Sequence, residues 1–146
     1  MSMKVSAKTE YACIAVLELA SRYGTRSPMR VRQIADRHRV PARFLVQILL
    51  QLKGAGFVMS TRGASGGYQL VRPPEQISLG EVVELMEGGP VEQDSSTAAS
   101  PDSPAVKALQ DVWNEAAQVQ RRLLQQITFA QLLEKAKSYD HQMYYI

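Results

Sequence analysis

Hydrophobic residues recur at spacings of three and four through the first quarter of the chain. This period predicts a helix over residues 5–22, with Ser6 as its N-cap and Gly24 just past its end. Its apolar positions are Ala12, Ala15, Val16, Leu19 and Ala20. A shorter pattern predicts a second helix over residues 31–38, with Val31, Ile34 and Ala35 facing inward. Both helices therefore have one face for a shared core.

A third amphipathic pattern follows a break at Val40-Pro41. Because proline is tolerated in a first helical turn, we expect a helix over Pro41–Lys53. Its inward residues are expected to be Phe44, Leu45, Ile48, Leu49 and Leu52, and its outer face to show Arg43, Gln47, Gln51 and Lys53. Two helices joined by a short turn, the second of them amphipathic and basic, are typical of a helix-turn-helix.

Two β-prone runs come next, at Phe57–Thr61 and Tyr68–Val71, and a glycine-rich turn that carries Arg62 separates them. This pattern predicts a β-hairpin. A hairpin directly after a helix-turn-helix is the layout of a winged helix. The predicted fold is therefore mainly α with a small β-hairpin wing.

The polar and apolar pattern changes in the second half. Ser78 and Glu81 have capping-box spacing, and they predict a helix that ends at Gly88-Gly89-Pro90. Residues 91–103 are poor in apolar side chains and are expected to form a flexible linker. Pro104 opens a long helix to about Ile127. Thr128 is expected to cap a last short helix over Phe129–Lys137.

The long helix carries a heptad-like apolar seam, spaced alternately by three and four residues. The seam consists of Val106, Leu109, Trp113, Ala116, Gln120, Leu123 and Ile127. We interpret it as a dimer contact; the alternative is packing against the protein's own core. The expected organisation is a DNA-binding domain over residues 1–90, a linker over 91–103 and a dimerisation region over 104–146.

Composition limits the classes of function. The chain of 146 residues has a single cysteine, Cys13, so no intrachain disulfide or cysteine cluster can form. No run approaches the roughly 18 apolar residues of a membrane span, and charged residues interrupt the N-terminus, so we expect a cytoplasmic protein without a signal peptide. Cys13 is expected to pack as a small apolar residue.

Charge is divided unequally along the chain. Residues 1–72 hold twelve Lys and Arg against three Asp and Glu, whereas residues 73–146 hold five against eleven. The overall net charge of +3 conceals this division. Such asymmetry favours a half that binds a polyanion, joined to a half with a different role.

The candidate DNA contacts lie on the third helix and the hairpin. Arg43 and Gln47 are four apart, so they share a face, and their side chains commonly pair with guanine and adenine in the major groove. Arg62 is expected to enter a minor groove. Phosphate contacts are expected from Arg30, Arg32, Arg39, Lys53, Ser60, Thr61 and Ser65, and close backbone approach around Gly63, Gly66, Gly67 and Tyr68.

An enzyme is not supported by these residues. His38 stands in a basic run without a nucleophile beside it, and we expect it to be a surface or phosphate-contacting residue. His141 falls in a polar tail. The segment Gly63–Gly67 lacks the Lys-Ser/Thr of a phosphate-binding P-loop. No metal site is predicted.

Several motifs resemble one family of regulators. They are Arg32-Gln-Ile-Ala35, Phe44-Leu-Val-Gln47, Leu52-Lys-Gly-Ala-Gly-Phe57, Ser60-Thr-Arg-Gly-Ala-Ser-Gly-Gly-Tyr68 and the segment Leu70–Val83. Together they are similar to the Rrf2 family of winged helix-turn-helix transcription regulators, which has IscR-, NsrR- and CymR-type branches. The resemblance covers about residues 1–90. It implies a homodimer on a palindromic operator, with Arg62 in the minor groove and the 104–127 helix as the dimer contact. The family holds repressors and activators, and we expect this chain to be a repressor.

Two departures from the family pattern stand out. Cluster-binding members carry three cysteines between the helix after the wing and the dimerisation helix, and residues 91–103 hold none, so no iron–sulfur cofactor is expected. Val46 stands where cluster-sensing members often carry glutamate. Because glutamate can accept a hydrogen bond from cytosine and valine cannot, we expect a different operator preference.

Two alternatives remain open from the sequence. The chain ends Met143-Tyr144-Tyr145-Ile146, an apolar and aromatic end with a free carboxylate that a partner pocket can capture. The resemblance to the cysteine-metabolism branch implies that such a partner is a bound metabolic enzyme, for example a cysteine synthase. A small-molecule pocket near Trp113 and the linker is the other alternative.

Overall fold

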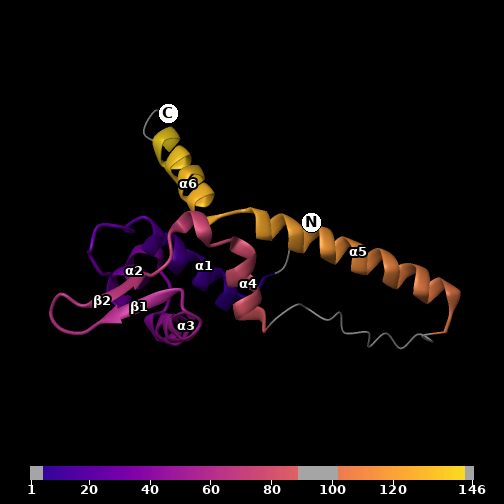
Figure 1. Cartoon of the computed structure of the whole chain (residues 1–146), viewed down its shortest axis with the longest axis horizontal. Coiled ribbons are helices and arrows are strands. Elements are labelled where there is room, and N and C mark those ends of the chain that lie inside the picture. Colours follow the sequence, from indigo (N-terminus) through magenta and orange to yellow (C-terminus); the bar gives the residue numbers. More distant parts are fainter. Residues whose placement is uncertain (1–4, 89–101, 144–146) are drawn as a thin grey trace.

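A computed structural model of the chain describes residues 5–88 and 102–143. In these ranges the chain forms six α-helices, one short 3-10 helix and two strands (Figure 1). In chain order these are α1 (Ala7–Ala20), α2 (Val31–His38), α3 (Ala42–Gly54), β1 (Val58–Thr61), β2 (Gly67–Leu70), η1 (Pro74–Gln76), α4 (Leu79–Glu87), α5 (Pro104–Gln126) and α6 (Phe129–Met143). The predicted fold class, mainly α with a β-hairpin wing, is confirmed.

Three of the helices begin at the caps that the sequence predicted. The hydroxyl of Ser6 accepts a hydrogen bond from the backbone N–H of Thr9. Ser78 and Glu81 form a reciprocal capping box at the start of α4. Before α6, the hydroxyl of Thr128 accepts a hydrogen bond from the backbone N–H of Gln131. The Gln131 side chain in turn accepts one from the backbone N–H of Thr128. Local polar side chains therefore fix these starts by satisfying N–H groups that a helix leaves free.

The hairpin pairs antiparallel from Val58 with Leu70 to Thr61 with Gly67. Its root is joined to the segment that leads into α2. The backbone N–H of Met29 donates to the Tyr68 carbonyl at 2.9 Å, and the Tyr68 N–H donates to the Met29 carbonyl at 2.7 Å. The wing is thus held to the helix-turn-helix by main-chain hydrogen bonds, a contact that the sequence did not predict.

One hydrophobic core lies among α1, α2, α3, α4 and the hairpin. Its fully buried large side chains include Leu19, Met29, Ile34, Leu45, Ile48, Leu49, Leu52, Ile77 and Phe129. Phe129 belongs to α6, so the chain returns to this core after α5. Backbone hydrogen bonds from Leu79 to Ile127 and from Phe129 to Ile77 join the start of α4 to this return.

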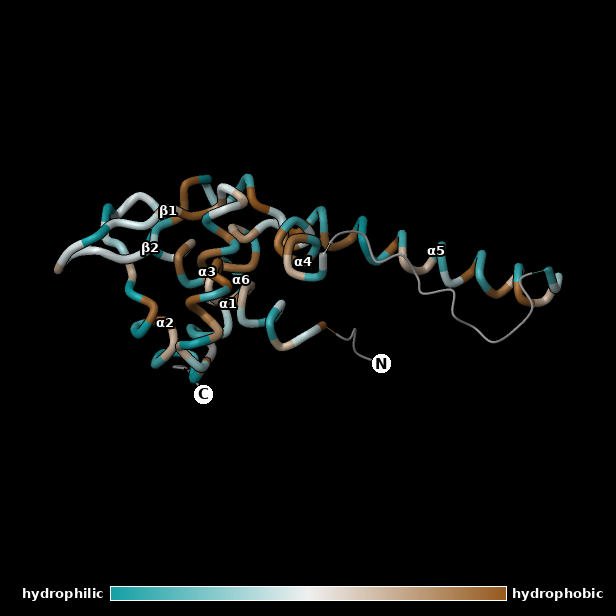
Figure 2. Tube along the Cα trace, turned by 90° about the horizontal axis from the view of Figure 1, so that it is seen from below, coloured by the Kyte–Doolittle hydropathy of each residue, from teal (hydrophilic) through white to brown (hydrophobic). Residues whose placement is uncertain are grey.

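Helix α5 extends away from the core along the long axis of the molecule (Figure 1). None of its residues is buried. In Figure 2, hydrophobic positions recur along it between hydrophilic ones. Among the residues described, no helix is long and apolar enough to cross a membrane.

Several element boundaries differ from the sequence prediction. Helix α1 spans Ala7–Ala20 rather than residues 5–22. Helix α3 begins at Ala42, and Pro41 is its N-cap with an extended backbone rather than its first helical residue. Helix α6 continues to Met143, beyond the predicted end at Lys137. Of the predicted linker, residues 91–101 lie outside the described ranges.

Candidate nucleic-acid interface

The exposed face of α3 carries Arg43, Val46, Gln47 and Leu50, all on the solvent side. At 3.6 residues per turn these four positions occupy about 100° of the helix circumference. The buried side chains of the same helix are Leu45, Ile48, Leu49 and Leu52, on the opposite face. The predicted sharing of one face by Arg43 and Gln47 is therefore confirmed.

Two α3 side chains differ from the prediction. Phe44, expected in the core, is 45% exposed. It lies at the edge of the helix, where its ring is 6.2 Å from the ring of Tyr11 and the Arg43 guanidinium lies 5.0 Å from its centroid. Gln51, expected on the outer face, donates to the carbonyl of Leu85 at 3.2 Å. The expectations failed because both residues sit at the boundary between the buried and exposed faces.

The end of α3 is joined to the wing by a side-chain contact. The Lys53 ammonium donates to the hydroxyl of Ser60 at 2.8 Å. Thr61, the next residue, is exposed at the end of β1. The structure thus places two of the predicted phosphate-contacting side chains, Lys53 and Ser60, together between the helix and the hairpin.

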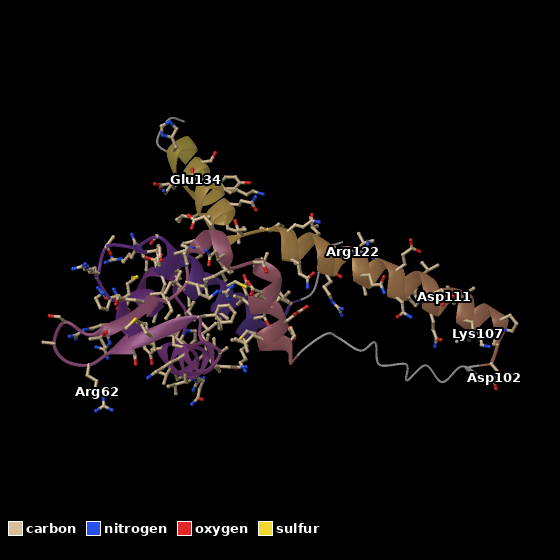
Figure 3. The ribbon with its side chains drawn as sticks, viewed as in Figure 1. Arg62, Asp102, Lys107, Asp111, Arg122 and Glu134 are labelled. Carbon is tan, nitrogen blue, oxygen red and sulfur yellow. The ribbon has the colours of Figure 1, made fainter. Side chains whose placement is uncertain are left out.

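The loop at the tip of the wing spans residues 62–66. Arg62 extends from it away from the body of the molecule (Figure 3). Arg30, expected to contact phosphate, donates through its guanidinium to the carbonyl of Ala64. This bond links the start of α2 to the wing loop, so Arg30 helps to hold the loop that presents Arg62.

The wing glycines shape this loop in different ways. Gly63 and Gly67 have φ of +102° and +147°, which favour glycine. Gly66 is buried and does not have a positive φ; a Cβ there would overlap the Thr61 carbonyl oxygen. A Cβ at Gly67 would lie 2.5 Å from the carbonyl oxygen of Met29. Tyr68 is half-buried against the core. These contacts support the shape of the wing.

The turn between α2 and α3 carries more positive charge. Arg39 ends α2 in the left-handed conformation with φ of +55°, and both Arg32 and Arg39 are exposed. His38 has a partner that the sequence did not show. Its Nε2 lies 3.0 Å from Oε2 of Glu18, a carboxylate that also accepts from Arg37 at 2.6 Å. His38 therefore helps to join α2 to α1.

The predicted seam of α5 is largely exposed. Leu109, Trp113 and Leu123 are each more than half exposed, and Ala116 and Gln120 are exposed as well. Val106 and Ile127 are half-buried. Packing of this seam against the protein's own core, the alternative interpretation, is thus contradicted for its central part.

The structure adds Val112 and Val119 to this face, each 57% exposed. With Leu109, Ala116 and Leu123 they form a second series spaced by three and four, without a polar member. We call the combined set of Leu109, Val112, Trp113, Ala116, Val119 and Leu123 the α5 apolar face. The sequence pattern contained this second series, but the seam through Trp113 masked it.

The available donor atoms do not fit an iron–sulfur cluster of the family type. Cys13 is partly buried within α1, where burial and the charge of Glu10 raise the pKa of its thiol to about 11. The sequence offers no second cysteine. Within residues 5–88 and 102–143, no three His, Cys, Asp or Glu side chains gather as a metal site. Thiolate ligands are what such clusters require.

The structure describes only part of the two segments for which the sequence left other functions open, the C-terminal tail and the surroundings of Trp113. Residues Tyr144–Ile146 of the predicted interaction tail lie outside the described ranges, and only the backbone of Met143 is described, as the end of α6. Trp113 lies on the exposed face of α5. Both alternatives stay predictions.

Comparison with known proteins gives a consistent result. Residues 5–135 match the family model of Rrf2, described as an iron-dependent transcriptional regulator. Protein rrf2 of Nitratidesulfovibrio vulgaris is 34% identical over 136 residues, which cover 92% of this chain and 89% of that protein. The HTH-type transcriptional regulator CymR of Bacillus subtilis is 37% identical over 92 residues, 62% of this chain and 66% of that protein.

Solved structures agree with these matches. The structure of CymR, the global cysteine regulator of B. subtilis, superposes with a TM-score of 0.78 at 28% identity, covering 92% of this chain and 98% of that one. The structure of IscR of T. potens gives a TM-score of 0.74 at 31% identity, covering 93% and 90%. The similarity therefore extends over the wing, the helix-turn-helix and α5.

Proposed function

Because this chain belongs to the Rrf2 family of transcriptional regulators, we propose that it represses transcription as a homodimer bound to a palindromic operator. Its relatives are DNA-binding HTH-type regulators, and the chain is not an enzyme. The single observation that carries the proposal is that α3 and the β-hairpin wing lie side by side. The exposed face of α3 and the wing that presents Arg62 are linked through Lys53 and Ser60.

In this proposal α3 enters the major groove, where Arg43 and Gln47 contact base edges. Arg62 enters the adjoining minor groove, whose negative potential attracts a guanidinium. The phosphates between the two grooves are contacted by Lys53, Ser60 and Thr61. Arg32, near the start of α2, contacts the sugar–phosphate backbone of the DNA. Gly66, Gly67 and Tyr68 set the position of the wing.

The α5 apolar face supports the dimer. Leu109, Val112, Trp113, Val119 and Leu123 are each 56–57% exposed in the single chain. A contiguous apolar face of this kind on a helix outside the core marks a protein interface. A second copy offers the same face, and a two-fold dimer on a palindrome needs a self-complementary contact of this type. Of the other predicted contacts, Val106 and Gln120 lie on the same helix and Ile127 is its C-cap.

The dimer is tested by placing a charge in this face. Val112→Glu should convert the protein to a monomer in sedimentation at micromolar concentration, because an ionised carboxylate would be buried in an apolar contact. Gln118→Glu, on the exposed opposite side of α5, is the matched control and should leave the dimer intact. A Val112→Glu dimer of unchanged affinity would contradict the assignment.

We further propose that the regulator works without a resident iron–sulfur cluster, since Cys13 is the only thiol in the chain and burial raises its pKa. The test is an ultraviolet–visible spectrum of anaerobically purified protein. We expect only protein absorbance. Visible bands that iron and sulfide analysis assigns to a cluster would overturn this part.

DNA selection from a random pool tests the function itself. The purified chain should enrich a palindromic consensus whose half-sites are centred about one helical turn, or a multiple of it, apart. Transcription in vitro from a promoter that contains the consensus should fall when the protein is added. Failure to enrich any consensus would refute sequence-specific binding, and activation instead of inhibition would refute repression.

A further inference from the structure

Two apolar side chains stand in the middle of the exposed face of α3. Val46 is 42% exposed and Leu50 is 50% exposed. They are four residues apart, so they lie one above the other on the helix surface. Around the helix they fall between Lys53 on one side and Arg43 on the other. Single exposed apolar residues are ordinary, but this pair occupies the centre of a face whose flanks are cationic.

The charged surroundings indicate what covers this pair. Lys53 contacts Ser60 of the wing at 2.8 Å, and Arg62 extends from the same wing. A partner that fits this surface must therefore present negative charge on both sides of a small apolar feature. DNA has this arrangement, because phosphates line the major groove and the C5-methyl group of thymine projects into it.

We propose that Val46 and Leu50 read thymine methyl groups, and that they make the operator half-site depend on thymine next to the bases contacted by Arg43 and Gln47. Valine and leucine offer no hydrogen-bond donor or acceptor, so they cannot distinguish the polar edges of the bases. They can distinguish thymine from cytosine by the methyl group of thymine. On binding, this methyl group packs against the alkyl side chains and is no longer exposed to water, which is favourable. The selectivity is one of shape and burial.

This inference rests on the proposed function, and the experiment separates the two. An operator is first selected from random DNA by the full-length protein. Each thymine of a half-site is then replaced by deoxyuridine in both half-sites. Uracil keeps every hydrogen-bonding group of thymine and lacks only the methyl group, so a change in dissociation constant reports the methyl contact alone.

We expect at least one thymine position to show weaker binding on replacement by uracil. Loss of one buried methyl group should raise the dissociation constant about fourfold. Replacing the same thymine in both half-sites should therefore raise it about fifteenfold. Val46→Ala or Leu50→Ala should weaken binding to the selected operator and remove the difference between thymine and uracil at that position. Val71→Ala, at a valine 51% exposed after β2, makes the same chemical change away from α3 and should keep the full difference.

The possible outcomes are distinct. If no sequence is enriched, the proposed function fails. If a sequence is enriched but contains no fixed thymine, or binds equally with uracil at every position, the reading of methyl groups by α3 is wrong and the proposed function stands. A methyl preference that survives both Val46→Ala and Leu50→Ala also overturns the inference. Circular dichroism confirms that each variant is folded; since both side chains are exposed, neither change creates a core cavity.

Discussion

Replacing Gly67 with alanine tests how the wing is attached to the helix-turn-helix. A Cβ at this position would lie 2.5 Å from the Met29 carbonyl oxygen and 2.6 Å from its carbonyl carbon. These atoms are backbone, so they cannot rotate out of the way. Moving them breaks the pair of hydrogen bonds between Met29 and Tyr68, at 2.9 and 2.7 Å. We therefore expect the hairpin to detach at its root.

The magnitude follows from two contributions. The backbone at Gly67 has φ of +147°, and a non-glycine residue in such a region costs about 1–3 kcal/mol. Loss of two backbone hydrogen bonds adds about 1 kcal/mol each. Gly67→Ala should therefore lower the free energy of unfolding by about 3–5 kcal/mol. Denaturant titration followed by circular dichroism measures this change.

Gly63 provides the matched control. It has φ of +102°, but a Cβ there meets nothing within 4 Å. Gly63→Ala should therefore show the backbone cost alone, and Gly67→Ala should exceed it by about 2 kcal/mol. Equal destabilisation by the two variants would refute the close approach of the wing to Met29. Operator affinity should follow the same order, since a detached wing cannot place Arg62.

Three further predictions concern α1 and α4. Iodoacetamide at pH 8 should modify Cys13 about 100-fold more slowly in the folded protein than in urea, because burial raises the pKa of its thiol from 9.0 to about 11; equal rates would disprove the burial. Glu87 should stabilise the fold at neutral pH, because the hydrogen bond from Thr9 at 2.6 Å lowers the pKa of its carboxyl below the usual 4.5. Because this pKa is lower in the folded protein, the stabilisation is present above pH 4.5 and is lost as the pH falls through the pKa of the folded state. The unfolding free energies of wild type and Glu87→Gln should therefore differ at pH 7 and converge in acid. Gly80→Ala should destabilise by about 1–3 kcal/mol, since its Cβ would press on α5 at 2.9 Å, whereas Gly54→Ala, with open space around its Cβ, should be neutral or stabilising in thermal unfolding.

Much of the fold could be predicted from the sequence, because local chemistry determines it. Ser6, Ser78 and Thr128 cap helices through hydrogen bonds that span only three residues. The period of the apolar residues gave α2 its observed bounds, Val31–His38, and placed Arg43 and Gln47 on one exposed face. Such features need no knowledge of the rest of the chain.

The contacts that position the site could not be predicted, because they join residues far apart in the sequence. Thr9 and Glu87 are 78 residues apart, and Arg30 and Ala64 are 34 apart. Phe129 looks in the sequence like the start of a terminal helix, yet it lies fully buried in the hydrophobic core with residues of α1, α3 and α4. Phe44 shows the limit of periodicity, since a helical wheel cannot say on which side of a boundary an aromatic ring falls.

The measurement that tests the central claim most directly is the salt dependence of operator binding by wild type and Arg62→Ala. If α3 and the wing bind DNA together, the logarithm of the association constant should fall steeply and linearly with the logarithm of the salt concentration. Arg62→Ala should weaken binding by about 1–3 kcal/mol per protomer and reduce the slope by about one for each protomer, while the dimer persists. Arg122→Ala, at an exposed arginine of α5, is the control and should match wild type. Unchanged affinity and slope in Arg62→Ala would contradict the account.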